Sequence, residues 1–543
     1  MAMNVIPLRY GSNLSGMKKL ILVIGALGLL EPGRTHPQVA EPIWVYGSAV
    51  APFSGSRAAS LQCDDTGATV ILDVLIPGAF PAEWSALITK LDVFGQVLWA
   101  DTLHDHMPIG HADMVLDDDD HILACAFGPG TIRVRKYSPL GLILWTTEIV
   151  HTGAQDMPLY IREGAGQVYV ATTSYTDTTG RDLITRGLTD TGVLLWEQRY
   201  ESGLPPYNEF LAGAAVDVVG RPYSSGLSVD TLVGSMLLQS LHLDGTPRWE
   251  ARSYPSESAH GLVLERSGID RMILLGMRPV PGGGGTDLVV HCYDTLGNQL
   301  WTQQLSIGDA DSPRDLSIAS DGTVFCIGTG TAADGSKDLG AFGISASGTL
   351  LWSHVVDDGP LEVLGSGIAA EAGGSCVLVG TRADPMQGGR SAIFTQRLDP
   401  SGQPLWSDLY TTPNEGHSGA HDVVVDPSGD ILVHGQMRDT TISDEILVLK
   451  YAQETGLSEE GSTGSFMVAW PNPATDRVQV TYPGLHAGSR LRLTDTLGRV
   501  VAWGRSGMPH LELVALTPGL YDLACVDARG MVMARCPLVI GSH

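Results

Sequence analysis

Short stretches in which apolar and polar residues alternate run along most of the chain, and turn residues separate them. The segment HDVVVDPSGDILVHGQM, followed after a polar loop by DEILVLKYA, shows this most clearly. Alternation with a period of two and many β-branched residues is typical of strands, and Asp-Pro-Ser-Gly is typical of a tight turn. The pattern therefore predicts many short antiparallel strands.

One segment recurs about every fifty residues: a turn containing Gly, then Leu-Trp or a variant of it, as in LTDTGVLLW and ISASGTLLW. The repeats end at Trp99, Trp145, Trp196, Trp249, Trp301, Trp352 and Trp406. We expect each Trp to fill the space between adjacent sheets, since this side chain buries about 150–250 Å². Apolar neighbours favour this role over exposed aromatics that stack on carbohydrate, and they are Leu98, Leu144, Leu195 and Leu351.

The repeats divide the chain into eight units. Their first strands are predicted to begin near Ala58, His111, Met157, Leu211, His260, Arg314, Leu364 and His421. The eighth unit stops at Tyr451 without a Leu-Trp strand. The segment PIWVY at 42–46 resembles such a fourth strand but precedes the first unit. We therefore predict an all-β, eight-bladed β-propeller over 41–451 whose N-terminal strand completes the last blade. Such closure leaves no exposed sheet edge between the chain ends.

These units resemble the secreted bacterial β-propeller repeat, whose consensus runs roughly AIAVDSSGNVYVTG…DYATIKYDSNGNELW. DVVVDPSGDILVHGQM…EILVLKYA and DLSIASDGTVFCIGTG carry the resemblance, which covers about 42–451. It implies the fold and is nearly silent about activity.

A polar, Gly/Ser-rich linker is predicted at 452–465, and a different domain at 466–543, a small β-sandwich. Three motifs carry its resemblance to the C-terminal sorting domain of the Bacteroidetes type IX secretion system. They are Pro471-Asn472-Pro473, Gly498 in DTLGR, and Gly519 with Tyr521 in LTPGLY. The resemblance implies export across the outer membrane by that machinery, then usually removal of the tail with surface anchoring or release. The chain departs from it by ending in PLVIGSH rather than in a Lys-rich strand.

The segment 1–40 is predicted to hold a signal peptide, with Met17 as the natural start. Two lysines precede the apolar run Leu20–Leu30, which is too short to span a bilayer as a helix. No later segment is long and apolar enough for a membrane span. We expect a secreted or outer-membrane-surface protein, and a monomer.

The net charge is −27, which disfavours a nucleic-acid partner and an anionic membrane surface. The seven cysteines fit no zinc-ribbon spacing. Cys125, Cys326 and Cys376 lie in apolar strand patterns and are expected to be small buried hydrophobes.

The loops after the second and fourth strands of the units are long and varied, whereas the other turns are short. Function usually lies on such loops, so we expect any ligand on that face or at the mouth of the channel. His104, His106, His111 and Asp113 are weak candidates for metal ligands. Asp117–Asp120 lacks the spaced pattern of a calcium loop and is interpreted as a solvated turn. No cofactor is predicted, with calcium or another divalent cation as the alternative.

The leading hypothesis is a non-catalytic binding or adhesion module for an extracellular protein or glycan. The alternative is a secreted enzyme at the channel mouth, either a metal-assisted hydrolase or lyase using the His104–Asp113 segment, or a quinoprotein-like oxidoreductase. Thr191–Trp196 fits a blade motif of those eight-bladed oxidoreductases, but their adjacent Cys-Cys pair is absent. A passive surface component is a third reading.

Overall fold

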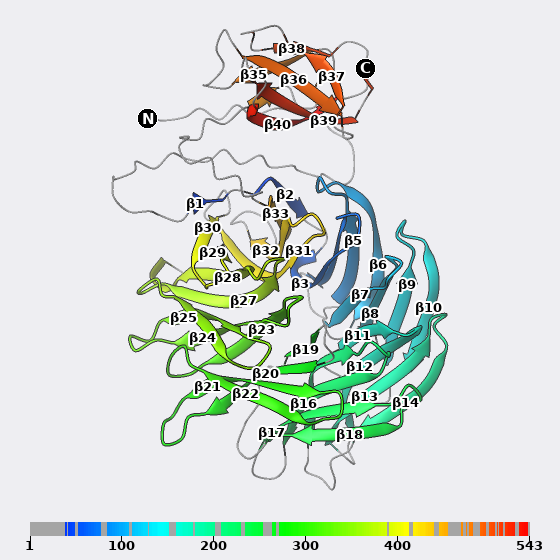
Figure 1. Cartoon of the computed structure of the whole chain (residues 1–543). Coiled ribbons are helices and arrows are strands. Elements are labelled where there is room, and N and C mark those ends of the chain that lie inside the picture. The colour runs from blue at the N-terminus through cyan, green and yellow to red at the C-terminus, as the bar shows by residue number, and fades with distance from the viewer. Residues whose placement is uncertain are drawn as a thin grey trace. The chain divides into compact units, whose positions relative to one another are not determined.

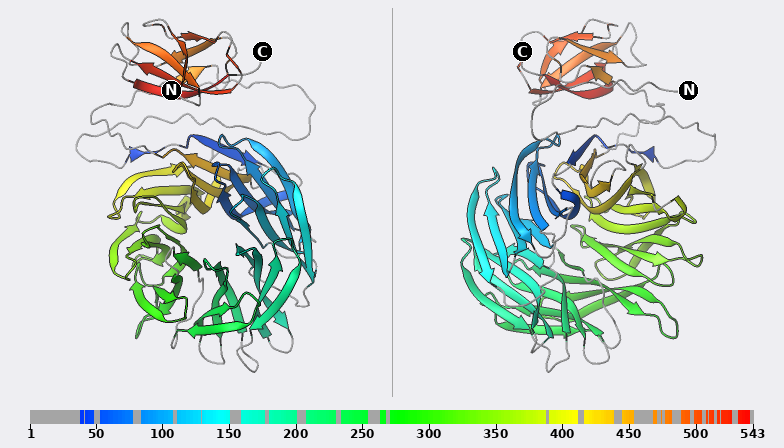
Figure 2. Two further views of the ribbon diagram at one scale, coloured as in Figure 1. Left: turned by 45° about the vertical axis from the view of Figure 1, so that its right-hand side comes forward. Right: turned by 180° about the vertical axis from the view of Figure 1, so that it is seen from behind.

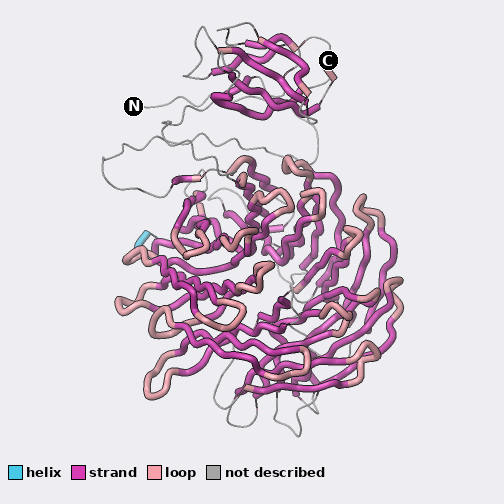
Figure 3. The backbone as a smooth tube through the Cα atoms, viewed as in Figure 1, coloured by secondary structure: helices cyan, strands magenta, loops and turns pink. Residues whose placement is uncertain are grey.

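The computed structural model describes residues 38–540 with gaps, and the chain divides into two compact units, Met1–Gln453 and Glu454–His543. The gaps are 41, 49–52, 78–83, 108–110, 129, 151–158, 177–179, 201–207, 230–233, 254–262, 268–270, 388–389, 412–415, 439–444, 454–467, 471–473, 475–476, 482–488, 496–498, 505–507, 509, 514–515, 518 and 527–531. The described residues form strands joined by turns and loops, and their one helical element is the 3-10 turn η1 (Pro385–Gln387) (Figure 3). None of them forms a helix able to cross a membrane.

The first unit contains eight antiparallel blades, whose strands we call a to d in chain order within each blade (Figure 1). Blades 1 to 4 comprise β3 (Phe53–Cys63), β4 (Thr69–Pro77), β5 (Trp84–Leu91), β6 (Val97–Met107); β7 (Ala112–Leu116), β8 (Ile122–Gly128), β9 (Thr131–Tyr137), β10 (Ile143–Val150); β11 (Leu159–Gly164), β12 (Gln167–Thr176), β13 (Gly180–Thr189), β14 (Leu194–Tyr200); and β15 (Asn208–Val216), β16 (Pro222–Val229), β17 (Gly234–Leu241), β18 (Pro247–Arg252). Blades 5 to 7 comprise β19 (Val263–Ser267), β20 (Arg271–Pro279), β21 (Thr286–Asp294), β22 (Gln299–Leu305); β23 (Ser312–Ile318), β24 (Val324–Thr331), β25 (Lys337–Ile344), β26 (Leu350–Val356); and β27 (Glu362–Ala370), β28 (Cys376–Asp384), β29 (Arg390–Leu398), β30 (Pro404–Tyr410). The predicted propeller is confirmed.

Blade 8 is completed by the N-terminal part of the chain. Its strands are β31 (His417–Val425), β32 (Ile431–Arg438), β33 (Glu445–Tyr451) and, as strand d, β2 (Trp44–Ser48). β2 is antiparallel to β33, with Trp44 opposite Lys450. The predicted closure is therefore confirmed. The sequence pattern did not indicate β1 (Gln38–Val39), which pairs in parallel with β30 on the outer edge of blade 7, where Gln38 lies opposite Trp406.

The blades are arranged radially, with strand a innermost (Figure 2). Carboxylates on strand a join neighbouring blades. Each accepts a hydrogen bond from a backbone N–H on strand a of the next blade. Asp113 Oδ2 accepts from Ile161 N at 3.0 Å, and Asp315 Oδ2 accepts from Ile368 N at 2.9 Å. Asp422 Oδ2 accepts from Leu61 N at 3.2 Å across the closure between blades 8 and 1.

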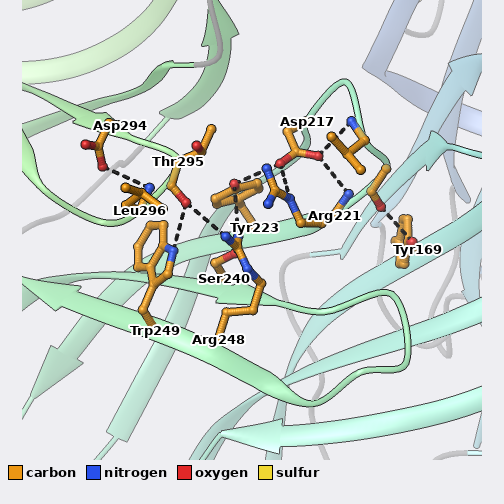
Figure 4. Close-up of polar contacts among 12 residues, drawn as sticks. Tyr169, Asp217, Arg221, Tyr223, Ser240, Arg248, Trp249, Asp294, Thr295 and Leu296 are labelled. Carbon is orange, nitrogen blue, oxygen red and sulfur yellow. Dashed lines mark hydrogen bonds and ion pairs between the residues drawn. The ribbon is translucent and has the colours of Figure 1, made fainter.

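The repeated Trp packs each blade against the next one. Its ring lies on the Gly of the next c–d turn, and its Nε1 donates to a carbonyl oxygen of that turn at 2.8–3.2 Å. The donors Trp44, Trp99, Trp145, Trp196, Trp249 and Trp301 reach the carbonyl oxygens of Val93, Pro139, Asp190, Leu243, Thr295 and Ala346. Figure 4 shows Trp249 beneath Thr295, with Arg248 donating to the same oxygen at 3.2 Å. Trp352 packs likewise on Gly402, but its Nε1 has no partner among the described residues.

The turn position opposite the Trp ring requires glycine for two reasons. Gly297 has φ +87°, a left-handed conformation that other residues adopt at a cost. A Cβ at this position would also lie 2.8 Å from the Trp249 ring. Gly and Trp therefore recur together because they form one contact between blades.

The leucines that precede the repeated Trp are exposed, and this corrects part of the sequence argument. Leu98, Leu144, Leu195 and Leu351 are 56%, 49%, 51% and 53% exposed. Successive side chains of a strand point to opposite faces, so strand d turns its Trp toward the next blade and its Leu outward. The packing role of the repeated Trp is confirmed, but the leucines that precede it are exposed and are not evidence for that role.

Buried ion pairs anchor the a–b turns of blades 1 and 8. Asp64 accepts the backbone N–H groups of Thr66 and Ala68 at 2.9 Å and pairs with Lys90 Nζ at 2.7 Å. Both side chains of the pair are 3% exposed. Lys450 Nζ and Asp426 form the same contact in blade 8 at 2.8 Å. Each pair fixes the turn to strand c of its own blade.

We expect Asp64→Asn to lower the free energy of unfolding at pH 7 by about 3 kcal/mol, because it leaves Lys90 without its counter-charge. Burial opposes ionisation of Asp64, but its hydrogen bonds and the Lys90 charge outweigh burial and lower its pKa. A lowered pKa stabilises the fold above the unfolded-state value of about 3.9 and loses this effect as pH falls through the folded-state value. Urea unfolding at pH 7 and pH 3 should show the difference from wild type shrinking at low pH. Asp65→Asn, at an exposed neighbour, is the control, and a difference independent of pH would contradict this reading.

The second unit is a β-sandwich, as predicted. One sheet contains β34 (Val468–Trp470), β35 (Arg477–Thr481) and β38 (His510–Glu512), and the other contains β37 (Val500–Trp503), β36 (Arg490–Asp495), β39 (Gly519–Val526) and β40 (Val532–Ile540). Val478 and Leu511 of the first sheet pack with Leu491, Leu523 and Leu538 of the second in one buried core. In the propeller, Cys125, Cys326 and Cys376 are fully buried at 0% exposure, which confirms that expectation.

Candidate binding site in the central channel

The channel wall is shaped by β-bulges in strand a. Blades 1, 4, 6, 7 and 8 each carry an extra residue opposite strand b. The residues in the bulges are Ala59, Ala212, Arg314, Ser366 and His421, and all five line one cavity of about 830 Å³. Because a bulge redirects a side chain, these positions place variable residues in the channel without altering the blade.

The acidic residues of the channel are already engaged. Asp113, Asp315 and Asp422 accept the backbone N–H groups that join the blades. Asp113 also pairs with Arg162 Nη1 at 2.8 Å. Burial raises the pKa of Asp422 to about 6, although the His434 charge opposes this. These carboxylates therefore have structural roles.

Two arginines of the same cavity are not engaged. Arg57 on β3 and Arg314 on β23 are exposed to the channel, and neither has a hydrogen-bond or ion-pair partner in the described part of the chain. No carboxylate of the described residues therefore holds the Arg57 side chain in place. An unpaired guanidinium facing a cavity is available for an anionic group.

His111 and His421 lie close enough to Arg57 to be affected by its charge. Burial, and then the Arg57 charge, lower the pKa of His111 to about 4. The pKa of His421 is also about 4, from burial and then the charges of His434 and Arg57. The His421 ring is nonetheless accessible from the cavity it lines. At neutral pH both rings are uncharged, and each can donate a hydrogen bond from one ring nitrogen and accept one at the other.

A second cavity, of about 510 Å³, opens beside the channel where blades 7, 8 and 1 meet, and we call it the seam pocket. It is lined by Arg57, Ala58, Ile76, Thr381, Ser391, His417, Ser418, Gly419, Ala420, His421, Gln436, Met437 and Arg438. Ile76 and Arg438 lie near the ends of b strands and His417 begins a strand a, so the pocket is on the face of the b–c and d–a loops. Arg57, Ala420 and His421 line both cavities.

A buried pair behind this pocket joins the two ends of the ring. His434 Nε2 on β32 and Asp73 Oδ1 on β4 are 3.0 Å apart, and the side chains are 0% and 1% exposed. Burial raises the pKa of Asp73, opposed by His434. Asp73 Oδ2 and His434 Nδ1 have no partner among the described residues. The pair fixes blade 1 to blade 8 from within.

The four residues that sequence analysis named as weak metal-ligand candidates belong to or directly precede two different strands of blades 1 and 2. His104 and His106 belong to β6, the outer strand of blade 1, and their side chains lie outside the described residues. His111 directly precedes the inner strand β7, which contains Asp113. Among the described residues no group of three or more His, Cys, Asp or Glu could hold a metal ion.

Two of the six sorting-motif residues fall in the described part of the chain. Gly519 begins β39, and Tyr521 on the same strand is buried at 7% exposure. The Tyr521 hydroxyl donates to the Thr517 carbonyl oxygen at 2.8 Å, which links Thr517 to strand β39. Pro471, Asn472, Pro473 and Gly498 lie outside the described residues.

Sequence analysis did not single out Arg57, and it named Arg314 and His421 only as the starts of first strands. A signal was present, because aligned first strands carry Ala59, Ala212 and Ser366 where blades 6 and 8 carry Arg314 and His421. A large polar residue at a position where other blades carry a small residue marks a departure from the repeat. His260, noted at the start of another first strand, lies outside the described residues.

Comparison with known proteins finds similarity in fold alone. No family model matches the chain, and no curated protein is a significant match. A structure of Chaetomium thermophilum Sqt1, bound to the N-terminus of ribosomal protein L10, is similar with 12% identity and a TM-score of 0.48, covering 74% of this chain and 98% of that one. The WD40 domain of SCAP from fission yeast is similar with 9% identity and a TM-score of 0.39, covering 75% and 94%. The Neurospora crassa Pan2 WD40 domain matches with 12% identity and a TM-score of 0.34, covering 62% and 88%.

Proposed function

We propose that this protein is an extracellular, non-catalytic binding module whose ligand enters the channel mouth at the seam pocket. One observation carries the proposal: strand-a bulges and the closure between blades place Arg57 and His421 in the wall of two adjoining cavities. The repeated Trp, Gly and Asp residues serve packing and turns, whereas these side chains depart from the repeat. A rigid scaffold that presents such residues in a concave site is typical of ligand binding.

The resemblance of the second unit supports export by the type IX secretion machinery. That unit is a compact sandwich separate from the propeller, and part of its LTPGLY motif is held by the Tyr521 hydrogen bond. Export would place the propeller on the cell surface or in the medium. The lysine-poor, acidic composition suits a soluble extracellular surface.

The export proposal predicts that a chain lacking 466–543 accumulates in the periplasm of a bacterium that has the type IX system. The full chain should reach the surface or the medium. Arg477→Gln, at an exposed ion pair of the same unit, is the control and should be exported normally. Immunoblots of periplasmic, surface and medium fractions give the result, and export of the truncated chain at the full-length level would refute this route.

The binding proposal is tested by screening the purified full chain against glycan arrays and bacterial and host cell surfaces. We expect saturable binding to at least one ligand that a soluble excess of that ligand abolishes. Binding by no member of these panels would overturn the proposed function.

A further inference from the structure

We infer that the seam pocket binds a carboxylate-bearing saccharide, with the sugar carboxylate on the Arg57 guanidinium and the sugar chain leading into the channel. This inference rests on the proposed function and assigns the ligand class of the same site. The guanidinium fork matches a carboxylate with two parallel hydrogen bonds.

The state of Arg57 is the first support. The chain carries 60 acidic residues against 33 basic ones, and many described arginines pair with a carboxylate. Arg135 pairs with Asp101 at 2.7 Å, and Arg199 pairs with Asp182 at 2.7 Å. Arg57 has no such partner within the described residues, and no acidic residue lines the seam pocket. Its charge is therefore left for a ligand.

The hydrogen-bonding side chains of the pocket are the second support. Gln436 and His417 are exposed in the pocket wall, and Ser391 lies beside them on blade 7. An amide, an imidazole and a hydroxyl together donate and accept hydrogen bonds, as the hydroxyl groups of a sugar require. His421 adds an uncharged ring on the channel side, where it meets Arg57. Arg438 also lines the pocket but is engaged in another interaction, so Arg57 is the available cation amid hydrogen-bonding groups. This arrangement suits an acidic sugar better than a densely charged polymer.

The space available is the third support. The seam pocket measures about 510 Å³ and adjoins the channel cavity of about 830 Å³ through residues that line both. Sites of about 300–1,000 Å³ are typical for small ligands. Arg314 lies in the wall of the larger cavity, also without a partner in the described part of the chain, and can receive a second carboxylate of a longer acidic chain.

Isothermal titration calorimetry of the full chain with trigalacturonate tests this inference. We expect saturable binding that weakens about tenfold or more in Arg57→Gln, since a charge-assisted contact is lost. Arg278→Gln, at an arginine on β20 of blade 5 outside the pocket, should leave affinity unchanged and controls for net charge. Thermal melting of each variant verifies that the fold is retained.

The other probes decide the ligand class. Neutral galactotriose and triglutamate should bind at least about tenfold more weakly than trigalacturonate if one charged contact adds to the sugar contacts. Equal binding of triglutamate would overturn the saccharide assignment, and equal loss in Arg57→Gln and Arg278→Gln would overturn the site. Failure with trigalacturonate while another array ligand binds would refute this inference and leave the proposed function standing. Failure with every ligand would refute both.

Discussion

Replacing Trp406 by alanine should lower the free energy of unfolding by about 3–5 kcal/mol, the range found for a large aromatic removed from a core. Trp406 is 1% exposed and is among the largest fully buried side chains. Its ring lies 5.4 Å from that of Tyr451 and belongs to the core shared by blades 7 and 8. Tyr451 ends strand c of blade 8 and packs on Trp406 as Tyr137, which ends strand c of blade 2, packs on Trp99. Denaturant unfolding monitored by circular dichroism measures the change.

The adjacent residue supplies a matched control. Leu405 lies on the same strand and is 42% exposed, because its side chain points to the other face. Leu405→Ala should change stability by no more than about 0.5 kcal/mol, as is usual for a surface position. Equal costs for the two substitutions would contradict the packing role assigned to the repeated Trp.

Deletion of residues 1–48 should destabilise the propeller by at least about 3–5 kcal/mol and make it prone to aggregation. The deletion removes β2, whose Trp44 and Tyr46 pack on a core of blades 8 and 1 that includes Leu61 and Ile446. It also leaves strand β33 as an exposed edge. A shift of the melting temperature together with light scattering measures both effects.

Two shorter deletions separate the closing strand from the segments before it. Deletion of 1–37 keeps both β1 and β2, and it should leave stability close to that of the full chain. Deletion of 1–41 also removes β1, which adds a two-residue pairing to blade 7, and should have an intermediate effect. A chain lacking 1–48 that melts like the one lacking 1–37 would contradict closure by β2.

The repeat made the ring predictable, because Trp and Gly recur for a contact that every pair of neighbouring blades must form. The orphan strand with Trp44 indicated the closure by the same reasoning. The prediction that Leu98 and its counterparts are buried was wrong. A Leu-Trp pair in an outer strand does not show which of the two side chains faces the next blade. β1 carries no repeat signal and pairs through two residues only, so its sequence could not reveal it.

The candidate site was harder to predict than the fold. The expectation of a ligand at the channel mouth came from loop lengths, whereas the residues that line the seam pocket lie mainly on strands. Arg57 and His421 are 364 positions apart by their numbers and meet only because blade 8 closes on blade 1. A one-residue bulge decides that His421 faces the channel, and bulges depend on register rather than on composition.

Residues near the N-terminus form the outer strand of the last blade, in register with β33. Val45 lies opposite Leu449, and opposed residues in antiparallel strands have Cβ atoms about 4.5–5.5 Å apart. Val45→Cys combined with Leu449→Cys should therefore form an intramolecular disulfide on mild oxidation, detected as a linked peptide by mass spectrometry. Val45→Cys combined with Leu447→Cys, two positions out of register, should not. Absence of the first bridge, or equal yields of both, would contradict a ring closed by the N-terminal strand.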